Sequence, residues 1–310
     1  MGMNMKRCMI VTVTVSLVAM SCDRGPAVST TRGTATVECD ESLFSVMRFQ
    51  AADFHNSYPD GMINIRAVEA REAVVDFLND SIRVIIMGRQ FNKEELAYIR
   101  TANIDYDSFK VALDAVVVIT NLQRGDATLR ITELDSIYTG ARTRWNKANT
   151  SLIDAYVGDV NSSTDEVFRT RVLDGKQFGA TITRVKSSET LLEDVKKNPN
   201  AIGIMGLGWL HGHEQEVTVC RLGGGSYQPD TAVVRGQFFS PAQAHVLRRY
   251  YPIVREVFMY TREPRRDVSY GFIAYVKDKK GQQNFVNHGF VPAALPVRMV
   301  TTTSEKVHEQ

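Results

Sequence analysis

A run of small polar residues, Asn161-Ser162-Ser163-Thr164, precedes a stretch of the chain with helical spacing. Ser163 and Glu166 have the spacing of a capping box, which predicts that a helix begins there. The first N–H groups of a helix lack partners and carry partial positive charge, so they readily donate to an oxyanion. Hydroxyls of Ser162, Ser163 and Thr164 would add further donors. The pattern therefore predicts an anion site, with an ordinary capped helix as the alternative.

A second candidate, Asp40-Glu41-Ser42-Leu43, follows a short strand near the start of the chain and opens a helix. The hydroxyl of Ser42 and the N–H of Leu43 could donate to an anion from that helix start. The alternative is that Ser42 is a plain N-cap. Asp40 and Glu41 are candidates for a carboxylate that accepts a proton from the ligand, which would reject an oxyanion without one.

Two arginines are candidate ligand cations. Arg89 follows the apolar residues 82–87, at the carboxyl end of an expected strand, where cleft residues lie in open α/β sheets. Its guanidinium could bind an oxyanion in bidentate fashion, or it could form a structural ion pair with Glu94, Glu95 or another carboxylate. Arg71 begins the next helix upstream, and a solvated helix arginine is the alternative for it.

Strand and helix patterns alternate from residue 36 onward, which indicates an α/β protein with parallel sheets. Residues 82–87, 109–120 and 201–206 are apolar enough to form buried strands. We expect helices at 43–55, 69–79, 92–99, 132–138, 163–173, 187–197 and 241–249, and a last one from about 268 past 285.

The alternation forms two series, which predicts two lobes with the ligand cleft between them. We expect a discontinuous first lobe, made of residues 36–115 and 226–300, and a continuous second lobe at 116–225. Residues 301–310 form a polar tail.

The N-terminus combines Lys6 and Arg7 with an uncharged apolar run at 8–20 and a cysteine at position 22. The run is too short to span a membrane comfortably, because a spanning helix needs about 20 apolar residues. It resembles a bacterial lipoprotein signal, so we expect residues 1–22 to be the signal and Cys22 to be lipidated. A plain secretory signal or a buried first helix are the alternatives. Residues 23–35 read as a flexible tether.

Cys39 and Cys220 remain once the signal and the anchor are set aside. In an exported protein they could form a disulfide. The alternative is two buried apolar thiols, which the spacing alone does not exclude.

Several blocks resemble, in order, the phosphate-binding proteins of bacterial ABC importers, particularly their lipoprotein branch. They include the 161–164 loop, which is similar to that family's serine-glycine-threonine anion loop, and cover roughly residues 36–292. The other blocks are 79–95, 134–145 (LDSIYTGARTRW), 198–206 (NPNAIGIMG), 251–255 (YPIVR) and 281–292. The resemblance implies a two-lobed, type 2 periplasmic-binding-protein fold, in which each lobe is a mixed, mostly parallel sheet flanked by helices.

The resemblance also implies an exported, lipid-anchored, monomeric binding protein that closes over phosphate or a related oxyanion and presents it to an ABC transporter permease. Sulfate, molybdate or a small organic anion are alternative ligands, and a sensor or interaction lipoprotein is the alternative role. We expect no enzyme, cofactor or metal. The formal net charge of +2 is too small to indicate a nucleic-acid partner. His211 and His213 indicate a surface turn, because a structural zinc site needs about four ligands.

Three departures from the family pattern bear on ligand specificity. The middle glycine of the anion loop is Ser163, and the arginine that precedes the loop is missing, with Gly158 and Asp159 in that region. The family's usual aspartate after the third strand falls near Gly88. Asp159 therefore joins Asp40 and Glu41 as a candidate acceptor of a ligand proton.

Overall fold

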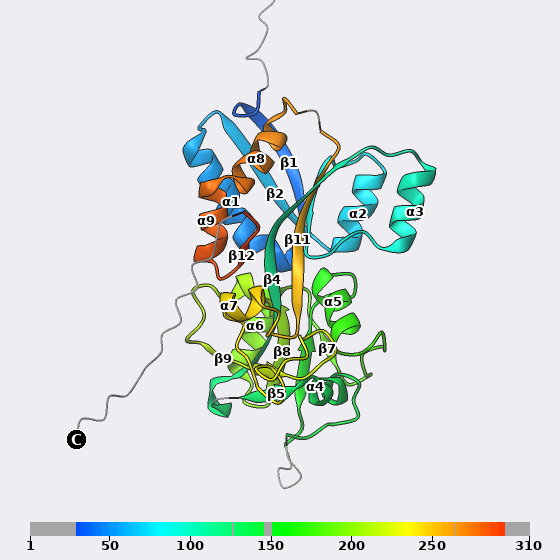
Figure 1. The fold of residues 1–310 in the computed structure, drawn as a ribbon, viewed down its shortest axis with the longest axis vertical. Helices are drawn as coiled ribbons and strands as arrows, with labels where there is room; N and C mark the ends of the chain where they lie inside the picture. The colour runs from blue at the N-terminus through cyan, green and yellow to red at the C-terminus, as the bar shows by residue number, and fades with distance from the viewer. Residues whose placement is uncertain (1–28, 126, 146–150, 264, 295–310) are drawn as a thin grey trace, which may run out of the picture.

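The computed structural model describes residues 29–125, 127–145, 151–263 and 265–294. Figure 1 shows two lobes stacked along the long axis of the molecule, joined by two long strands. These are β4 (Asp107–Asn121) and β11 (Val254–Thr261), which pair antiparallel with Arg255 opposite Asp114. Both strands contribute residues to each lobe, so one sheet runs through the whole molecule.

The first lobe is built on parallel strands that meet β11 at the centre of the sheet. β1 pairs in parallel with β2 and β3, and β3 pairs antiparallel with β11. Every residue of β3 is buried, as its uninterrupted apolar sequence requires. The strands are β1 (Gly33–Asp40), β2 (Gly61–Val68) and β3 (Val84–Met87), and the helices are α1 (Phe44–Ser57), α2 (Ala70–Leu78), α3 (Lys93–Thr101), α8 (Val268–Lys277) and α9 (Lys279–Asn287).

The second lobe continues the sheet from the other half of β4. β8 pairs antiparallel with β4 and in parallel with β6, and β6 continues to β7. The elements are β6 (Asp154–Val157), β7 (Thr183–Arg184), β8 (Ala201–Gly206), β9 (Val217–Val219), α4 (Ile131–Tyr138), α5 (Ser163–Arg171), α6 (Ser188–Lys197) and α7 (Gln243–Leu247). Smaller elements are β5 (Thr128–Arg130), β10 (Arg221–Gly223), β12 (Val291–Pro292), η1 (Glu41–Leu43), η2 (Leu122–Arg124) and η3 (Leu207–Leu210).

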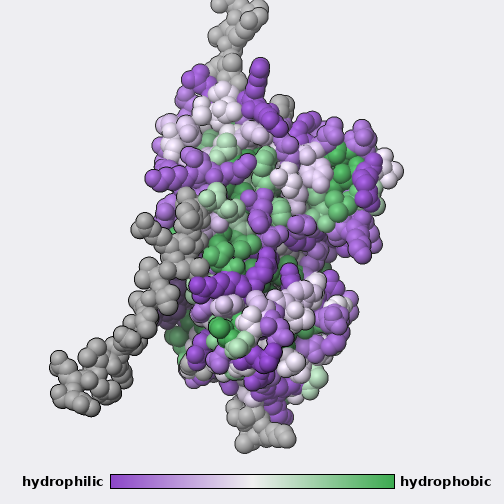
Figure 2. All heavy atoms as spheres, in the orientation of Figure 1, coloured by the Kyte–Doolittle hydropathy of each residue, from purple (hydrophilic) through white to green (hydrophobic). Residues whose placement is uncertain are grey.

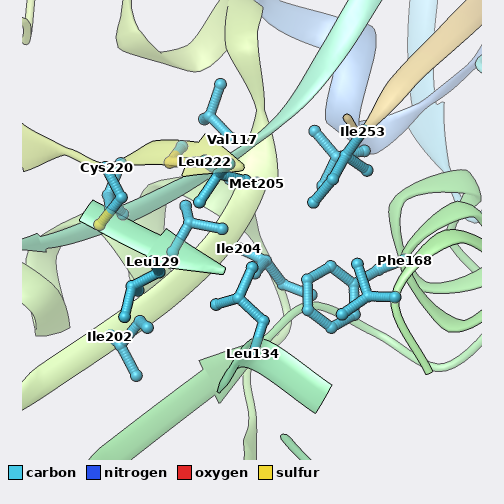
Figure 3. Close-up of a cluster of buried hydrophobic side chains, with 14 of the residues drawn as sticks. Val117, Leu129, Leu134, Phe168, Ile202, Ile204, Met205, Cys220, Leu222 and Ile253 are labelled. Atoms are coloured by element: carbon cyan, nitrogen blue, oxygen red, sulfur yellow. The ribbon is translucent and has the colours of Figure 1, made fainter. Parts of the chain in front are cut away.

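Each of the two shared strands passes from one hydrophobic core to the other. On β4 the change lies between Ala112, in the first core, and Ala115, in the second, close to the expected end of the first segment. On the return path Tyr251 and Ile253 still pack in the second core, and Val257 packs in the first. Figure 3 shows Ile253 in the second core. Val246, Tyr251 and Ile253 thus pack in the second core, although residues 226–300 were expected in the first lobe.

Three expected elements differ from the structure. Residues 33–35, expected in the tether, are the start of β1. The helix expected at 241–249 is only Gln243–Leu247, and Arg249 has a left-handed backbone with φ of 56°. The expected last helix is two helices, because Asp278 adopts an extended conformation that ends α8 and opens α9.

The two cysteines lie in different hydrophobic cores. Cys39 packs in the first lobe and Cys220 in the second, where Figure 3 shows it beside Leu222. The disulfide alternative is therefore excluded, and both thiols are buried. Across the described residues, none of the helices combines the length and apolarity that crossing a bilayer requires. The expected signal at 1–22, with Cys22, and the tail at 301–310 lie outside the described residues.

Candidate functional site at the lobe interface

The loop 161–164 lies at the N-terminus of α5, where that helix faces the first lobe. The N-cap is Ser162, whose Oγ accepts from the N–H of Asp165 at 3.1 Å. The helix therefore begins one residue away from the expected capping box of Ser163 and Glu166. This shift leaves the N–H of Ser163 pointing across the interface, where it donates to Oδ2 of Asp40 at 2.8 Å.

Asp40 is a fully buried carboxylate at the end of β1 and receives donors from both lobes. Its other oxygen, Oδ1, accepts from the N–H of Ser42 at 2.9 Å and from the Ser42 hydroxyl. Two of the expected ligand donors, Ser42 and Ser163, are thus brought together around one carboxylate. Leu43 instead buries its side chain in the first core, next to this cluster.

An arginine reaches the anion loop from β11. Arg255 is 3% exposed, and its Nη1 donates to Ser163 Oγ and Thr164 Oγ1 at 3.0 Å each. Its Nε and Nη2 lie 2.7 and 2.6 Å from Oδ2 of Asp114, whose Oδ1 accepts from the N–H of Ala115. Burial raises the pKa of Asp114, and the positive charge of Arg255 limits that rise.

Two glycines make room for this network. A Cβ at Gly88 would lie 2.6 Å from Ser163 Oγ and 2.8 Å from Arg255 Nη1. A Cβ at Gly206 would lie 2.5 Å from the Ser42 carbonyl and 2.7 Å from Arg255 Nη2. A glycine is therefore required at position 88, because the guanidinium and the serine hydroxyl occupy the space that a side chain would need.

A second carboxylate joins the lobes at the N-terminus of α6. Oε1 of Glu41 accepts from the N–H of Ser188 at 2.9 Å, and Oε2 accepts from the Ser188 hydroxyl at 2.8 Å. Burial raises the pKa of Glu41 to about 7, while the hydrogen bonds from Ser188 act in the opposite direction. Trp209 donates its indole N–H to the Glu41 carbonyl at 3.1 Å, so this indole lies directly on the lobe contact.

Arg89 adopts the ion-pair alternative. Its Nη1 and Nη2 each lie 2.8 Å from a carboxylate oxygen of Glu95, and its Nε lies 2.7 Å from Oε2 of Glu166 on α5. Burial raises the pKa of Glu166, and the charge of Arg89 opposes this. Arg89 therefore links the two lobes through its ion pairs with Glu95 in the first lobe and Glu166 in the second.

The remaining candidates lie around the start of α2. The Arg71 side chain is exposed, and its backbone N–H donates to the Asn161 carbonyl at 3.2 Å across the interface. Asp159 accepts from the N–H of Val160. Glu69 has a buried Oε2 that makes no hydrogen bond with the described part of the chain. Burial raises the pKa of Glu69 to about 8, with the charges of Asp40 and Asp159 adding to the rise.

Sequence reasoning missed Arg255, Asp114, Glu69 and Ser188. Asp114 is the single charged residue in the apolar run 111–120 (VALDAVVVIT), and Arg255 lies in the buried strand that follows Tyr251. A single charge within an apolar strand is a signal for a buried partner, because an unpaired charge is costly to bury. This signal could have found the Asp114–Arg255 pair.

The histidines 211 and 213 lie in the turn after η3. The ring of His211 packs on His288 with centroids 4.3 Å apart, and His213 contacts Glu216. Over the described ranges, no group of three or more His, Cys, Asp or Glu side chains is placed to hold a metal ion.

The two-lobed fold, with hydrogen-bond donors from both lobes meeting at their interface, defines a ligand-binding protein of the periplasmic-binding-protein class. Residues 25–280 match the family model described as the PBP superfamily domain, so the chain belongs to this family. The resemblance to phosphate-binding proteins and the expected two-lobed type 2 fold are both confirmed by the comparisons that follow.

Among curated proteins, the phosphate-binding protein PstS of Staphylococcus saprophyticus is 25% identical over 242 residues, covering 75% of this chain and 71% of the relative. The PstS of Pseudomonas aeruginosa is 20% identical over 278 residues, covering 84% and 82%. A Clostridium perfringens substrate-binding protein solved with bound phosphate superposes with a TM-score of 0.72 at 18% identity, covering 84% of this chain and 99% of that one. An ABC-type phosphate transport receptor from Vibrio cholerae gives 0.62 at 17% identity, covering 83% and 99%.

Proposed function

We propose that this protein captures phosphate, or a related oxyanion, between its two lobes and delivers it to an ABC importer. One observation supports this most directly. The N–H of Ser163, the hydroxyls of Ser42 and Thr164 and the guanidinium of Arg255 converge in one buried site between the lobes. Donors of this kind neutralise an oxyanion without requiring a bare charge on the protein.

The contact between Asp40 and Ser163 suggests how the ligand is held. An oxyanion that enters the site replaces the Asp40 carboxylate at the N–H of Ser163, because both are anions suited to a helix N-terminus. Asp40 then accepts the proton of the ligand. Sulfate lacks that proton at neutral pH, so two negative oxygens would face each other and sulfate would be rejected. Of the three candidate acceptors, Asp40 is the one bonded to these donors.

Ligand binding drives closure by population shift. An anion that contacts Ser42 in the first lobe and Ser163 in the second makes its full set of bonds only when the lobes are together. The first lobe is proposed to comprise 33–113 with 256–294, and the second lobe 114–255. The importer would bind the closed form of the monomer.

We also propose that Cys22 carries a lipid that holds the protein at the membrane of the cell envelope. This rests on the positive, apolar and cysteine pattern of residues 6–22. Mass spectrometry of the mature N-terminus would test it. An unmodified Cys22, or cleavage at another position, would contradict the anchor and leave the binding role unaffected.

Calorimetry on the purified full-length protein, with phosphate, arsenate, sulfate and molybdate as ligands, tests the binding role. The Trp145→Phe variant retains Trp209 as the sole tryptophan, because the chain has two, so its fluorescence then reports the lobe contact. We expect saturable binding of phosphate and arsenate, lost on Ser162→Ala with Thr164→Ala. Thr101→Ala on the exposed end of α3 is the matched control. No response to any of the four oxyanions would refute the proposal.

A further inference from the structure

A cavity of about 680 Å³ opens beside Arg255 and is lined by both lobes. Its inner end is formed by Gly88 and Arg255, and its second-lobe wall includes Arg171, Tyr227 and Arg249. Clefts of about 300–1,000 Å³ hold ligands of drug size. A tetrahedral oxyanion of five heavy atoms fills only a small part of such a space, so the cavity fits a larger ligand that reaches Arg255, the residue that the cavity shares with the proposed anion site.

The cavity lining carries more positive than negative side chains: the arginines 89, 171, 249 and 255 against the glutamates 166 and 256. The guanidinium of Arg171 stacks on the Tyr227 ring at 3.8 Å, and the structure places no carboxylate within ion-pairing distance of it among the residues it describes. Arg249 Nη2 lies 3.4 Å from Oε1 of Glu256, a carboxylate that Lys110 also approaches at 3.5 Å. Burial lowers the pKa of Arg171 and the charge of Arg249 adds to this, while Tyr227 and Glu256 act in the opposite direction. An anion between the two arginines would likewise favour the charged form of Arg171.

Arg249 ends the short helix α7. Its φ of 56° lies in the left-handed region, its N–H donates to the Val246 carbonyl at 3.1 Å, and the N–H of Tyr250 donates to the His245 carbonyl at 2.8 Å, as is common where a helix ends. This turn places Arg249 on the cavity wall.

We propose that the ligand is an organic phosphate with a second anionic group. Its phosphoryl group binds the Ser163, Thr164 and Arg255 donors, and its second anionic group binds between Arg171 and Arg249. The apolar surfaces of Val167, Val254 and Phe258 line the space between the two ends. This inference rests on the proposed function, because the phosphoryl end uses the same donors, and it names the class of solute that the cleft selects.

The test compares three probes by calorimetry on the purified full-length protein: inorganic phosphate, glycerol 3-phosphate and 3-phosphoglycerate. We expect 3-phosphoglycerate to bind about tenfold or more tightly than the other two, since a hydrogen-bonded charge pair contributes that much. Arg171→Gln and Arg249→Gln each remove about tenfold of this affinity and leave inorganic phosphate unchanged. Arg248→Gln is the matched control, because this neighbouring side chain is exposed and lies away from the cavity.

The outcomes separate this inference from the proposed function. Tight binding of inorganic phosphate with weaker binding of both organic phosphates overturns the inference and leaves the binding role standing. Equal affinity for glycerol 3-phosphate and 3-phosphoglycerate, or an equal loss in the Arg248→Gln control, also overturns it. If none of the three probes binds while the thermal transition shows a folded protein, the proposed function fails together with the inference.

Discussion

Replacing Arg255 by methionine removes the cation that neutralises a buried carboxylate. The side chains of Arg255 and Asp114 are 1% and 0% exposed, and their nearest atoms are 2.6 Å apart. Methionine fills much of the same volume but offers no donor, so among the described residues Asp114 retains only the hydrogen bond from the N–H of Ala115.

Removing one partner of a buried ion pair costs about 3–5 kcal/mol of unfolding free energy. We expect the lower end, about 3 kcal/mol, because the Ala115 N–H still stabilises the carboxylate. For a chain of this size each kcal/mol corresponds to about 2–4 °C, so the melting temperature should fall by about 6–12 °C. Burial raises the pKa of Asp114, so in the variant the folded state binds more protons than the unfolded state, and the deficit should shrink as the pH is lowered.

Differential scanning calorimetry at pH 7 and at pH 4 measures both effects. Arg32→Met is the matched control, because the Arg32–Asp60 pair is 49% and 67% exposed and such pairs contribute about 0–1 kcal/mol. Replacing both buried partners, as Arg255→Met with Asp114→Leu, should recover most of the loss, since no uncompensated charge then remains. A loss below about 1 kcal/mol, or a double variant no more stable than the single one, would refute the reasoning.

Three further predictions concern the lobe interface. Gly88→Ala should destabilise the protein by about 1–3 kcal/mol and abolish oxyanion binding, because the added Cβ would lie 2.6 Å from Ser163 Oγ. Gly158→Ala is the control in the same thermal and binding assays, because its Cβ would have one neighbour, at 4.0 Å. An equal effect of the two substitutions would argue against crowding as the cause. The pKa of Glu69 is raised to about 8 in the folded protein, so the folded state binds a proton that the unfolded state releases, and stability should fall between about pH 4.5 and pH 8. Melting temperatures measured across this range should fall less in Glu69→Gln than in the unmodified protein. An unchanged pH dependence in the variant would show that Glu69 is not the titrating group. Asp40→Asn should bring the affinities for phosphate and sulfate closer together, as measured by calorimetry, because the amide no longer repels an unprotonated oxyanion; unchanged discrimination would point to another acceptor.

The spacing of apolar residues predicted most elements of the fold, because short, uninterrupted apolar runs such as β3 and β8 form buried central strands in an α/β protein. The boundaries that failed depend on contacts distant in sequence. Tyr251 and Ile253 pack in the second core, although the Gly-rich stretch before them suggested an earlier return to the first lobe. Asp278 breaks the last helix, although the apolar pattern continues on both sides of it.

The sequence pointed to some residues of the site, and their binding of a ligand stays a prediction. Ser42 and Ser163 were expected to donate to an anion, and in the structure both donate to Asp40, which was expected only as a proton acceptor. The choice of Arg89 partner was left open, since Glu95 is near in sequence while Glu166 is near only after the lobes are assembled. Arg255 supplies a cation to the anion loop from a strand 92 residues away, which no local motif could reveal.

The shared strands also determine how the lobes can move. Asp114 and Arg255 are opposite each other on β4 and β11, beside the register shift between Val257 and Phe258. In the proposed closure the lobes rotate about these strands. Groups close to a rotation axis travel little, so this movement would leave the pair intact and would separate contacts between separate elements, such as that of Glu41 with Ser188. The guanidinium would then stay aimed at the anion loop in both forms. A ligand entering the open cleft meets a preorganised cation, and most of the ordering cost of the site is met when the chain folds rather than when the solute binds.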